Sequence, residues 1–172
     1  MAKRAMKQLL KYLTAAAAML IALCLPAAGT HAQAAPSIVG SWSLVSLTVQ
    51  RSGNQLNLLG PQPQGQLIFG SDGRYVLMGI RADLPKLAEG SRLAGSTEEN
   101  KLIAEGTVAH FGTYTVDEAR SAIVFHIQKS SFPNWDGDVQ TRPFTLVGDR
   151  LTYVTPGSFG YGAATVVWQR AK

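Results

Sequence analysis

Between residues 41 and 170 the chain is a succession of short segments in which apolar and polar residues alternate, separated by tight-turn sequences. Such alternation is typical of strands that bury one face, and Ser71-Asp72-Gly73 and Gly148-Asp149 are residues that hairpin turns favour. Eight such segments at regular spacing indicate a β-sandwich or a β-barrel. The strands are expected at residues 41–50, 65–69, 74–81, 108–116, 121–129, 139–147, 150–155 and 163–170.

Residues 82–106 interrupt the β pattern. Ser96 and Glu99 have the spacing of a capping box, in which two side chains cap each other's backbone N–H groups at a helix start. We therefore expect a short helix at residues 100–105, between strands three and four of an all-β, eight-stranded antiparallel barrel. The leucines around this helix could cover an entrance to the barrel, or they could pack on its outer wall.

The first 34 residues have the layout of a bacterial-type secretory signal peptide. Four basic residues precede an uncharged apolar run at residues 15–25, and Ala32-Gln33-Ala34 offers small residues for cleavage. The run is shorter than the roughly 20 residues that span a bilayer, so we expect cleavage and no stable membrane insertion afterwards. The expected product is a domain of residues 35–172 that is periplasmic or secreted.

Removing this segment changes the charge of the protein. The whole chain has 16 basic and 11 acidic residues, a net of +5, and four of the basic residues lie before Ala35, which leaves 12 basic against 11 acidic, a net of +1. No basic stripe remains to follow a phosphate backbone, so we expect no nucleic-acid partner. Cys24 is the only cysteine and would be lost as well. We expect one monomeric domain without a disulfide.

Four motifs lie on these segments: Gly40-Ser41-Trp42, Phe111-Gly112-Thr113-Tyr114, Phe132-Pro133-Asn134-Trp135 and Arg142-x-Phe144-x-Leu146. Together with the hairpin sequences, they resemble the bacterial lipocalin-like domain family of calycin-type barrels. The resemblance implies an eight-stranded barrel with a possible internal cavity. Members of such families range from carriers to cyclases that act on hydrophobic intermediates.

The Gly148-Asp149 hairpin predicts one register well, because a two-residue turn pairs Phe144 with Tyr153. That face is apolar and aromatic, so it should point inward. Arg142 lies on the same face, and a buried cation needs a partner. It could hold a carboxylate or carbonyl of a ligand. Alternatively, it could pair with an internal carboxylate or reach water at the rim of the barrel.

The turn between the fourth and fifth strands leaves two registers open. A four-residue loop pairs Val116 with Ser121 and places His110 and Tyr114 inside the barrel, whereas a three-residue loop sets His110 opposite His126. The first is favoured because it buries the apolar residues of the fifth strand together. An imidazole titrates near neutral pH, so His110 could act as an acid or base beside Tyr114. It could equally be an interior histidine with satisfied hydrogen bonds.

The resemblance also implies how one end of the barrel is closed. In lipocalin-type barrels a tryptophan of the first strand closes one end, and an arginine near the end of the chain packs over it. Here Gly40, Trp42 and Arg170 would form this structural contact, a cation–π stack of about 0.5–2 kcal/mol. Trp135 lies on a loop and could be a lid, a partner contact or a plug.

We expect the barrel interior to bind a small hydrophobic molecule, because a mostly apolar pocket with a few polar groups is the usual form of a ligand site. Two alternatives stay open: a cyclase or isomerase in the same barrel, and a structural envelope barrel with a filled core. No motif for a metal site, a dinucleotide site or a nucleophile elbow is present, so no cofactor or metal is expected. The candidate ligand-binding residues are Tyr75, His110, Tyr114, Phe125, Arg142, Phe144, Tyr153 and Trp168.

Overall fold

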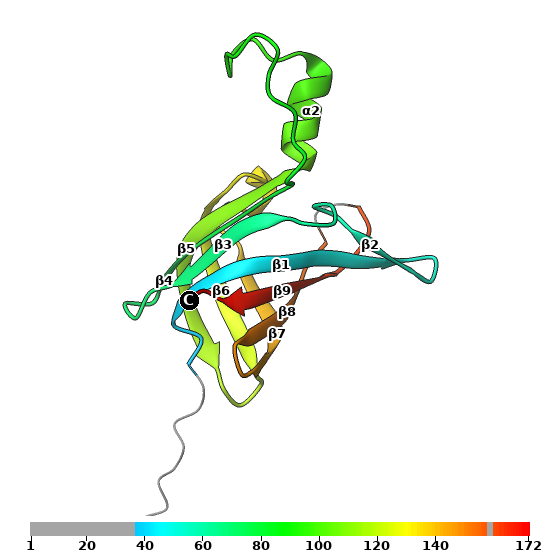
Figure 1. Cartoon of the computed structure of the whole chain (residues 1–172). Coiled ribbons are helices and arrows are strands. Elements are labelled where there is room, and N and C mark those ends of the chain that lie inside the picture. Colours follow the sequence, from blue (N-terminus) through cyan, green and yellow to red (C-terminus); the bar gives the residue numbers. More distant parts are fainter. Residues whose placement is uncertain (1–36, 158–159) are drawn as a thin grey trace, which may run out of the picture. The chain divides into compact units, whose positions relative to one another are not determined.

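One antiparallel sheet organises the computed structural model, which describes residues 37–157 and 160–172. Its strand order is β2-β1-β3-β4-β5-β6-β7-β8-β9, and β9 pairs with β1, which closes a ring of eight strands (Figure 1). The all-β fold and the closed eight-stranded antiparallel barrel are therefore confirmed. The strands are β1 Gly40–Arg51, β2 Asn54–Asn57, β3 Gln64–Phe69, β4 Arg74–Ile80, β5 Thr107–Asp117, β6 Ala122–Ser130, β7 Val139–Val147, β8 Arg150–Thr155 and β9 Ala164–Arg170.

The short strand β2 lies where the sequence predicts a loop. Gly53 has a φ of 81°, which lets the chain turn sharply and pair Asn54–Asn57 with the last residues of β1. Helix α2 (Thr97–Glu105) therefore lies between strands four and five, and the prediction that it lies between strands three and four is wrong. The extra strand escaped prediction because it is only four residues long and mostly polar.

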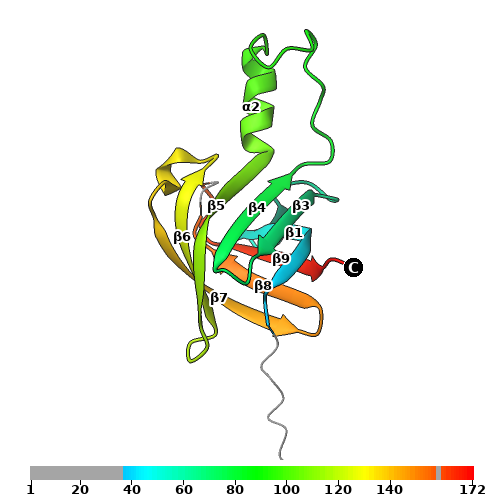
Figure 2. The same ribbon diagram turned by 90° about the vertical axis from the view of Figure 1, so that its left-hand side faces the viewer.

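Helix α2 begins at the predicted capping box. The Ser96 hydroxyl accepts a hydrogen bond from the Glu99 amide at 3.2 Å, and the Glu99 carboxylate accepts one from the Ser96 amide at 2.8 Å. No residue of α2 is buried, and Figures 1 and 2 show the helix standing away from the barrel beyond the ends of β4 and β5. Leu93, in the loop before the helix, is 98% exposed. Only the last residues of α2, Ala104 and Glu105, border the mouth of the barrel, where they line a cleft.

Alternating burial sets the inner face of each strand. In β4, Tyr75 and Leu77 are buried while their neighbours Val76 and Met78 are exposed, as the pleat of a strand requires. Gly73 closes the preceding turn with a φ of 79°. The β7–β8 hairpin has the predicted register, with Phe144 opposite Tyr153.

The register of β5 against β6 differs from both predicted alternatives. Val116 pairs with Ile123, because the loop occupies residues 118–121 and Ser121 adopts a left-handed conformation with a φ of 48°. Relative to the favoured alternative, β6 is displaced by two residues along β5. An even displacement keeps each side chain on its expected face, so His110 is buried and His126 is exposed.

A β-bulge interrupts the same pair of strands, where Gln128 has no partner in the register. Gly112 lies directly beside this bulge. A Cβ atom on Gly112 would collide with the carbonyl oxygen of His126, so the bulge requires glycine at this position. The space in front of Gly112 is thus occupied by the backbone of β6.

One end of the barrel is closed by Trp42 and Arg170. The Arg170 guanidinium carbon lies 4.2 Å from the Trp42 ring centroid, and its nitrogens donate to the carbonyls of Val39 at 3.0 Å and Ser37 at 2.8 Å. Gly40 lies beneath this contact, where a Cβ atom would come within 3.2 Å of the guanidinium. The contact ties the last strand to the segment before the first.

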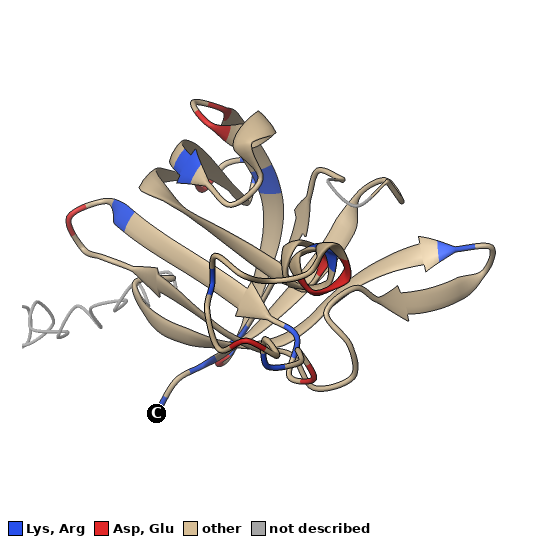
Figure 3. Ribbon diagram, turned by 90° about the horizontal axis from the view of Figure 1, so that it is seen from above, with Lys and Arg blue, Asp and Glu red and all other residues tan. Residues whose placement is uncertain are grey.

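Charged residues lie on the loops, on helix α2 and on strands, mostly near the strand ends. In Figure 3 both the Lys and Arg positions and the Asp and Glu positions are scattered over several parts of the ribbon. No helix within residues 37–157 and 160–172 is long and apolar enough to cross a membrane. The expected signal peptide, residues 1–34, lies outside the described residues.

Candidate functional site

A buried arginine lies at the centre of the barrel. Arg142 points inward from β7 and is 1% exposed. Its Nη2 and Nε atoms donate to the Oε1 atom of Gln140 at 2.7 and 3.2 Å. Gln140 lies two residues earlier on the same strand, so both side chains point to the same face. A neutral amide, not a carboxylate, therefore receives these hydrogen bonds.

Aromatic rings surround the same guanidinium. Its central carbon lies 4.5 Å from the ring centroid of Phe125, 5.4 Å from that of Tyr153 and 5.5 Å from that of Trp135. Each separation is within the range of a cation–π interaction. No carboxylate of the described residues lies within ion-pair distance of Arg142. Within the described residues, the guanidinium of Arg142 is thus stabilised by aromatic rings and by the amide of Gln140, and not by a counter-ion.

His110 of β5 connects Arg142 to Tyr75. Its Nε2 atom lies 3.5 Å from Arg142 Nη2, and its Nδ1 atom lies 2.8 Å from the Tyr75 hydroxyl oxygen. A guanidinium can only donate, so Nε2 accepts, and the ring proton lies on Nδ1 and is donated to Tyr75. Burial, together with the Arg142 charge, lowers the pKa of His110 well below its ordinary value. The imidazole is therefore neutral at neutral pH.

Trp135 covers this cluster from the mouth of the barrel. It ends the short 3-10 helix η1 (Pro133–Trp135) and is 7% exposed. Its ring packs edge-on against His110, with the centroids 5.8 Å apart, and Phe132 packs edge-on against its other side at 5.7 Å. Of the roles left open for Trp135, the structure shows the tucked-in position.

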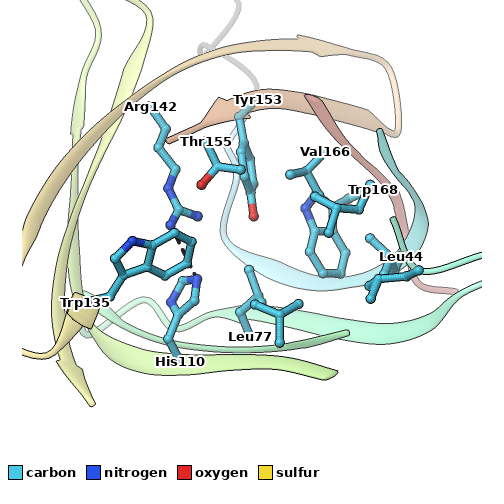
Figure 4. A pocket seen from close by; sticks show the side chains of 12 residues that line it. Leu44, Leu77, His110, Trp135, Arg142, Tyr153, Thr155, Val166 and Trp168 are labelled. Atoms are coloured by element: carbon cyan, nitrogen blue, oxygen red, sulfur yellow. Dashed lines mark hydrogen bonds between the residues drawn. The ribbon is translucent and has the colours of Figure 1, made fainter. Parts of the chain in front are cut away.

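A cavity of about 30 Å³ lies beside the polar cluster. One water needs about 10–15 Å³ by this measure, so the cavity has room for about two. Figure 4 shows the side chains of Arg142, Tyr153 and Thr155 pointing toward those of His110 and Leu77, with Val166 and Trp168 to the side. Its lining residues are Leu44, Leu47, Leu59, Leu77, Val108, His110, Trp135, Arg142, Tyr153, Thr155, Val166 and Trp168.

Two polar atoms at this cavity have no hydrogen-bond partner among the described residues: the Thr155 hydroxyl oxygen and the Trp168 indole nitrogen. Both residues are buried, at 6% and 0% exposed. Buried polar atoms are nearly always paired, so each unpaired one needs an explanation. Both atoms can donate a hydrogen bond.

The predicted site residues occupy three different places. His110, Arg142, Tyr153 and Trp168 line the cavity. Tyr75 and Phe125 lie behind it, in contact with His110 and Arg142. Tyr114 and Phe144 are not among the lining residues.

Tyr114 lies toward the closed end of the barrel. Its hydroxyl donates to the carbonyl of Gly70 at 2.9 Å, and its ring packs on Phe69 with the centroids 4.5 Å apart. Burial raises the pKa of its phenol. The acid–base pair of His110 and Tyr114 considered from the sequence is therefore not formed, because Tyr75 takes the place beside the imidazole.

Gln140 and Thr155 were missed by sequence reasoning. Gln140 lies two residues before Arg142, and Thr155 two residues after Tyr153, so each shares the inner face of a residue already singled out. Because side chains two residues apart on a strand share a face, taking the next inward position on each strand would have identified both residues.

A larger cleft of about 580 Å³ lies at the mouth of the barrel. Leu56, Leu58, Val108, Phe132 and Tyr161 supply its apolar and aromatic walls, and Arg81 and Glu105 contribute charge. Val108 lines both the cleft and the inner cavity, and Trp135 of the cavity touches Phe132 of the cleft. The two spaces are therefore neighbours.

A metal centre does not form in the described part of the chain, since no three side chains of His, Cys, Asp or Glu gather there. A closed eight-stranded antiparallel barrel with an inward-facing polar cluster defines a barrel of the lipocalin type. The chain belongs to the lipocalin-like domain family, whose model matches residues 39–171. No curated protein matches it.

Proposed function

We propose that this protein binds a small hydrophobic molecule at the open end of the barrel, with one end of the ligand entering the interior. The observation that carries the proposal is the pairing of an inner cavity with a neighbouring cleft. The cavity of about 30 Å³ is too small for the body of a ligand, since pockets for such molecules measure about 300–1,000 Å³. The cleft, at about 580 Å³, lies within that range.

Export belongs to the same proposal. The signal-like layout of residues 1–34 supports delivery to the periplasm or secretion. Sequencing the N-terminus of the protein recovered from the periplasm or medium should begin at Ala35. A protein retained in the cytoplasm with Met1 intact would contradict this part.

Binding is tested with N-phenyl-1-naphthylamine, a neutral apolar probe that fluoresces when it leaves water. Its fluorescence should rise on titration into the purified protein and saturate. Mass spectrometry of a solvent extract of the denatured protein should in addition find a co-purified lipophile. A wild-type protein that neither binds the probe nor carries a lipophile would favour the structural barrel with a filled core.

Two substitutions on β5 locate the probe. Val108→Phe would narrow the boundary between cavity and cleft, so a ligand that crosses it would lose contacts, and probe binding should weaken about tenfold or more, which is about 1.4 kcal/mol or more. Val116→Phe is the matched control, because Val116 lies at the other end of the strand and is 37% exposed. Equal binding by both variants would place the probe elsewhere.

A further inference from the structure

The hydrogen-bonding groups around the inner cavity are unbalanced toward donors. Arg142 carries a buried positive charge whose hydrogen bonds go to neutral groups, Gln140 and His110. Thr155 and Trp168 each present a polar atom without a partner at the same cavity. An indole N–H can only donate, and a guanidinium can only donate. The hydroxyl oxygens of Thr155 and Tyr153 can accept, but the donors at the cavity outnumber these acceptors, and among the described residues no carboxylate supplies a negative charge there.

From this imbalance we infer that the cavity is the head-group site for a carboxylate, so that the ligand is a monocarboxylate with a single apolar chain. The inference rests on the proposed function and names its ligand class. A carboxylate has two oxygen atoms that accept several hydrogen bonds and pairs well with a guanidinium. It would supply the missing charge and accept from Thr155 and Trp168.

The size of the cavity selects among anions. Room for about two waters suits the two oxygens of a carboxylate. A phosphate or sulfate ester carries more oxygens around a tetrahedral centre and would need a larger space. A cation is disfavoured because Arg142 lies in the same cavity, and among the described residues no carboxylate is present there to offset a second positive charge.

The apolar chain of the ligand has one neighbouring space that fits it. From the cavity, the wall formed by Val108 and Trp135 leads to the cleft, where Leu56, Leu58 and Phe132 offer apolar contacts. Of the two charged groups at the cleft, Arg81 is paired with Asp83 at 3.0 Å and Glu105 with Lys101 at 3.9 Å. The chain can therefore lie on apolar walls while the carboxylate alone occupies the donor-rich end.

Calorimetry with two ligands of equal chain length tests the inference. Decanoate should bind the purified protein about tenfold or more tightly than decanol, because a hydrogen bond to a charged group is worth more than a neutral one. Equal affinity for both would overturn the carboxylate site while leaving the proposed function standing. Failure of both ligands and of N-phenyl-1-naphthylamine would overturn the proposed function too.

Substitutions test which side chains cause the preference for decanoate over decanol. Arg142→Gln should abolish the advantage of decanoate over decanol, and Arg150→Gln is its control, since Arg150 is an exposed arginine on β8. Because Arg142→Gln could fail to fold, Thr155→Val serves as a second variant of nearly the same shape. It should weaken decanoate several-fold more than it weakens decanol. A Thr155→Val protein with unaltered preference for decanoate would contradict the assignment of this hydroxyl.

Discussion

The Nη2 atom of Arg142 lies 2.7 Å from the Oε1 atom of Gln140, two residues earlier on the same strand. This amide takes two hydrogen bonds of a buried guanidinium that has no carboxylate partner among the described residues. The relationship fixes the orientation of the cation and leaves its charge uncompensated. A lone buried charge is costly, so the stability of the barrel and any preference for an anion should both depend on this pair.

Replacing Gln140 with leucine should destabilise the protein. The change removes the acceptor and leaves buried guanidinium N–H groups unpaired, at a cost of about 1–3 kcal/mol or more, since the donor is charged. Urea denaturation would measure the loss as a lower midpoint. Gln128→Leu on the outer face of β6 is the control and should change stability by less than about 0.5 kcal/mol. Equal midpoints for the two variants would show that the amide has no special role.

Replacing Gln140 with glutamate makes a different prediction. The new carboxylate would sit against Arg142 and supply the charge that we infer a ligand supplies. The variant should therefore lose the preference for decanoate over decanol while still binding N-phenyl-1-naphthylamine. Calorimetry and probe fluorescence measure the two properties separately. A glutamate variant that keeps the full preference for decanoate would argue against Arg142 as the carboxylate partner.

Protonation of His110 should make stability fall in mild acid. Its pKa in the folded protein is lowered, by burial first and by Arg142 second, so the unfolded state binds the proton more readily. Stability from this group is complete above about pH 6.5, the ordinary pKa, and declines below it by up to about 1.4 kcal/mol per pH unit.

Urea midpoints between pH 7.5 and pH 5 would measure this dependence, in a range above that where the carboxyl groups titrate. His110→Gln should flatten the profile, whereas His126→Gln, on the exposed face of the neighbouring strand, should keep it. A profile that is equally steep in the His110 variant would assign the pH dependence to other groups.

Arg170→Met should destabilise the closed end of the barrel. It removes the cation–π contact with Trp42, about 0.5–2 kcal/mol, and the hydrogen bonds to the carbonyls of Ser37 and Val39. We expect a total loss of about 2 kcal/mol, measured by urea denaturation. Arg170→Lys should recover only part of this, because an ammonium lacks the planar fork of a guanidinium. Full recovery by lysine would show that charge alone is needed.

Gly112→Ala should be among the most damaging single changes in the sheet. The added methyl group would meet the His126 carbonyl oxygen, a backbone atom that cannot move without opening the bulge. Overpacking of this kind costs about 1–3 kcal/mol, occasionally more. Thermal unfolding should show a clear drop, while Thr113→Ala, next in the strand and exposed, should behave nearly as wild type. A stable alanine variant would mean that the bulge can rearrange.

The barrel was predictable from the sequence because alternation and turn residues act locally. The Gly148-Asp149 turn determines which residues of β7 and β8 face each other, so the inward placement of Arg142 and Tyr153 followed from a few neighbouring residues. The short strand β2 was not predictable in the same way. It forms because β1 is long enough to extend beyond the ring and offer it a partner.

The contacts within the site were harder to predict from the sequence than the identity of its residues. His110 was assigned to the interior, yet its partner is Tyr75 rather than Tyr114, because the chain offers both tyrosines at inner positions and only the packing of the barrel decides between them. The bulge at Gln128 shifts the pairing of β5 and β6 by one residue, and no turn-forming residues in the sequence indicate that a bulge occurs there. The size of the interior depends on how rings from distant strands interlock, which no local pattern specifies.

The pairing of β9 with β1 has a consequence for how the chain acquires its shape. The ring cannot be completed until residues 164–170, the last strand, have become available to the first. Contacts between such distant positions are slow to form, so the barrel of a nascent chain would stay open until β9 has been synthesised. If the protein is exported as we propose, a chain assembled in this order would still have an open sheet when it met the translocation machinery.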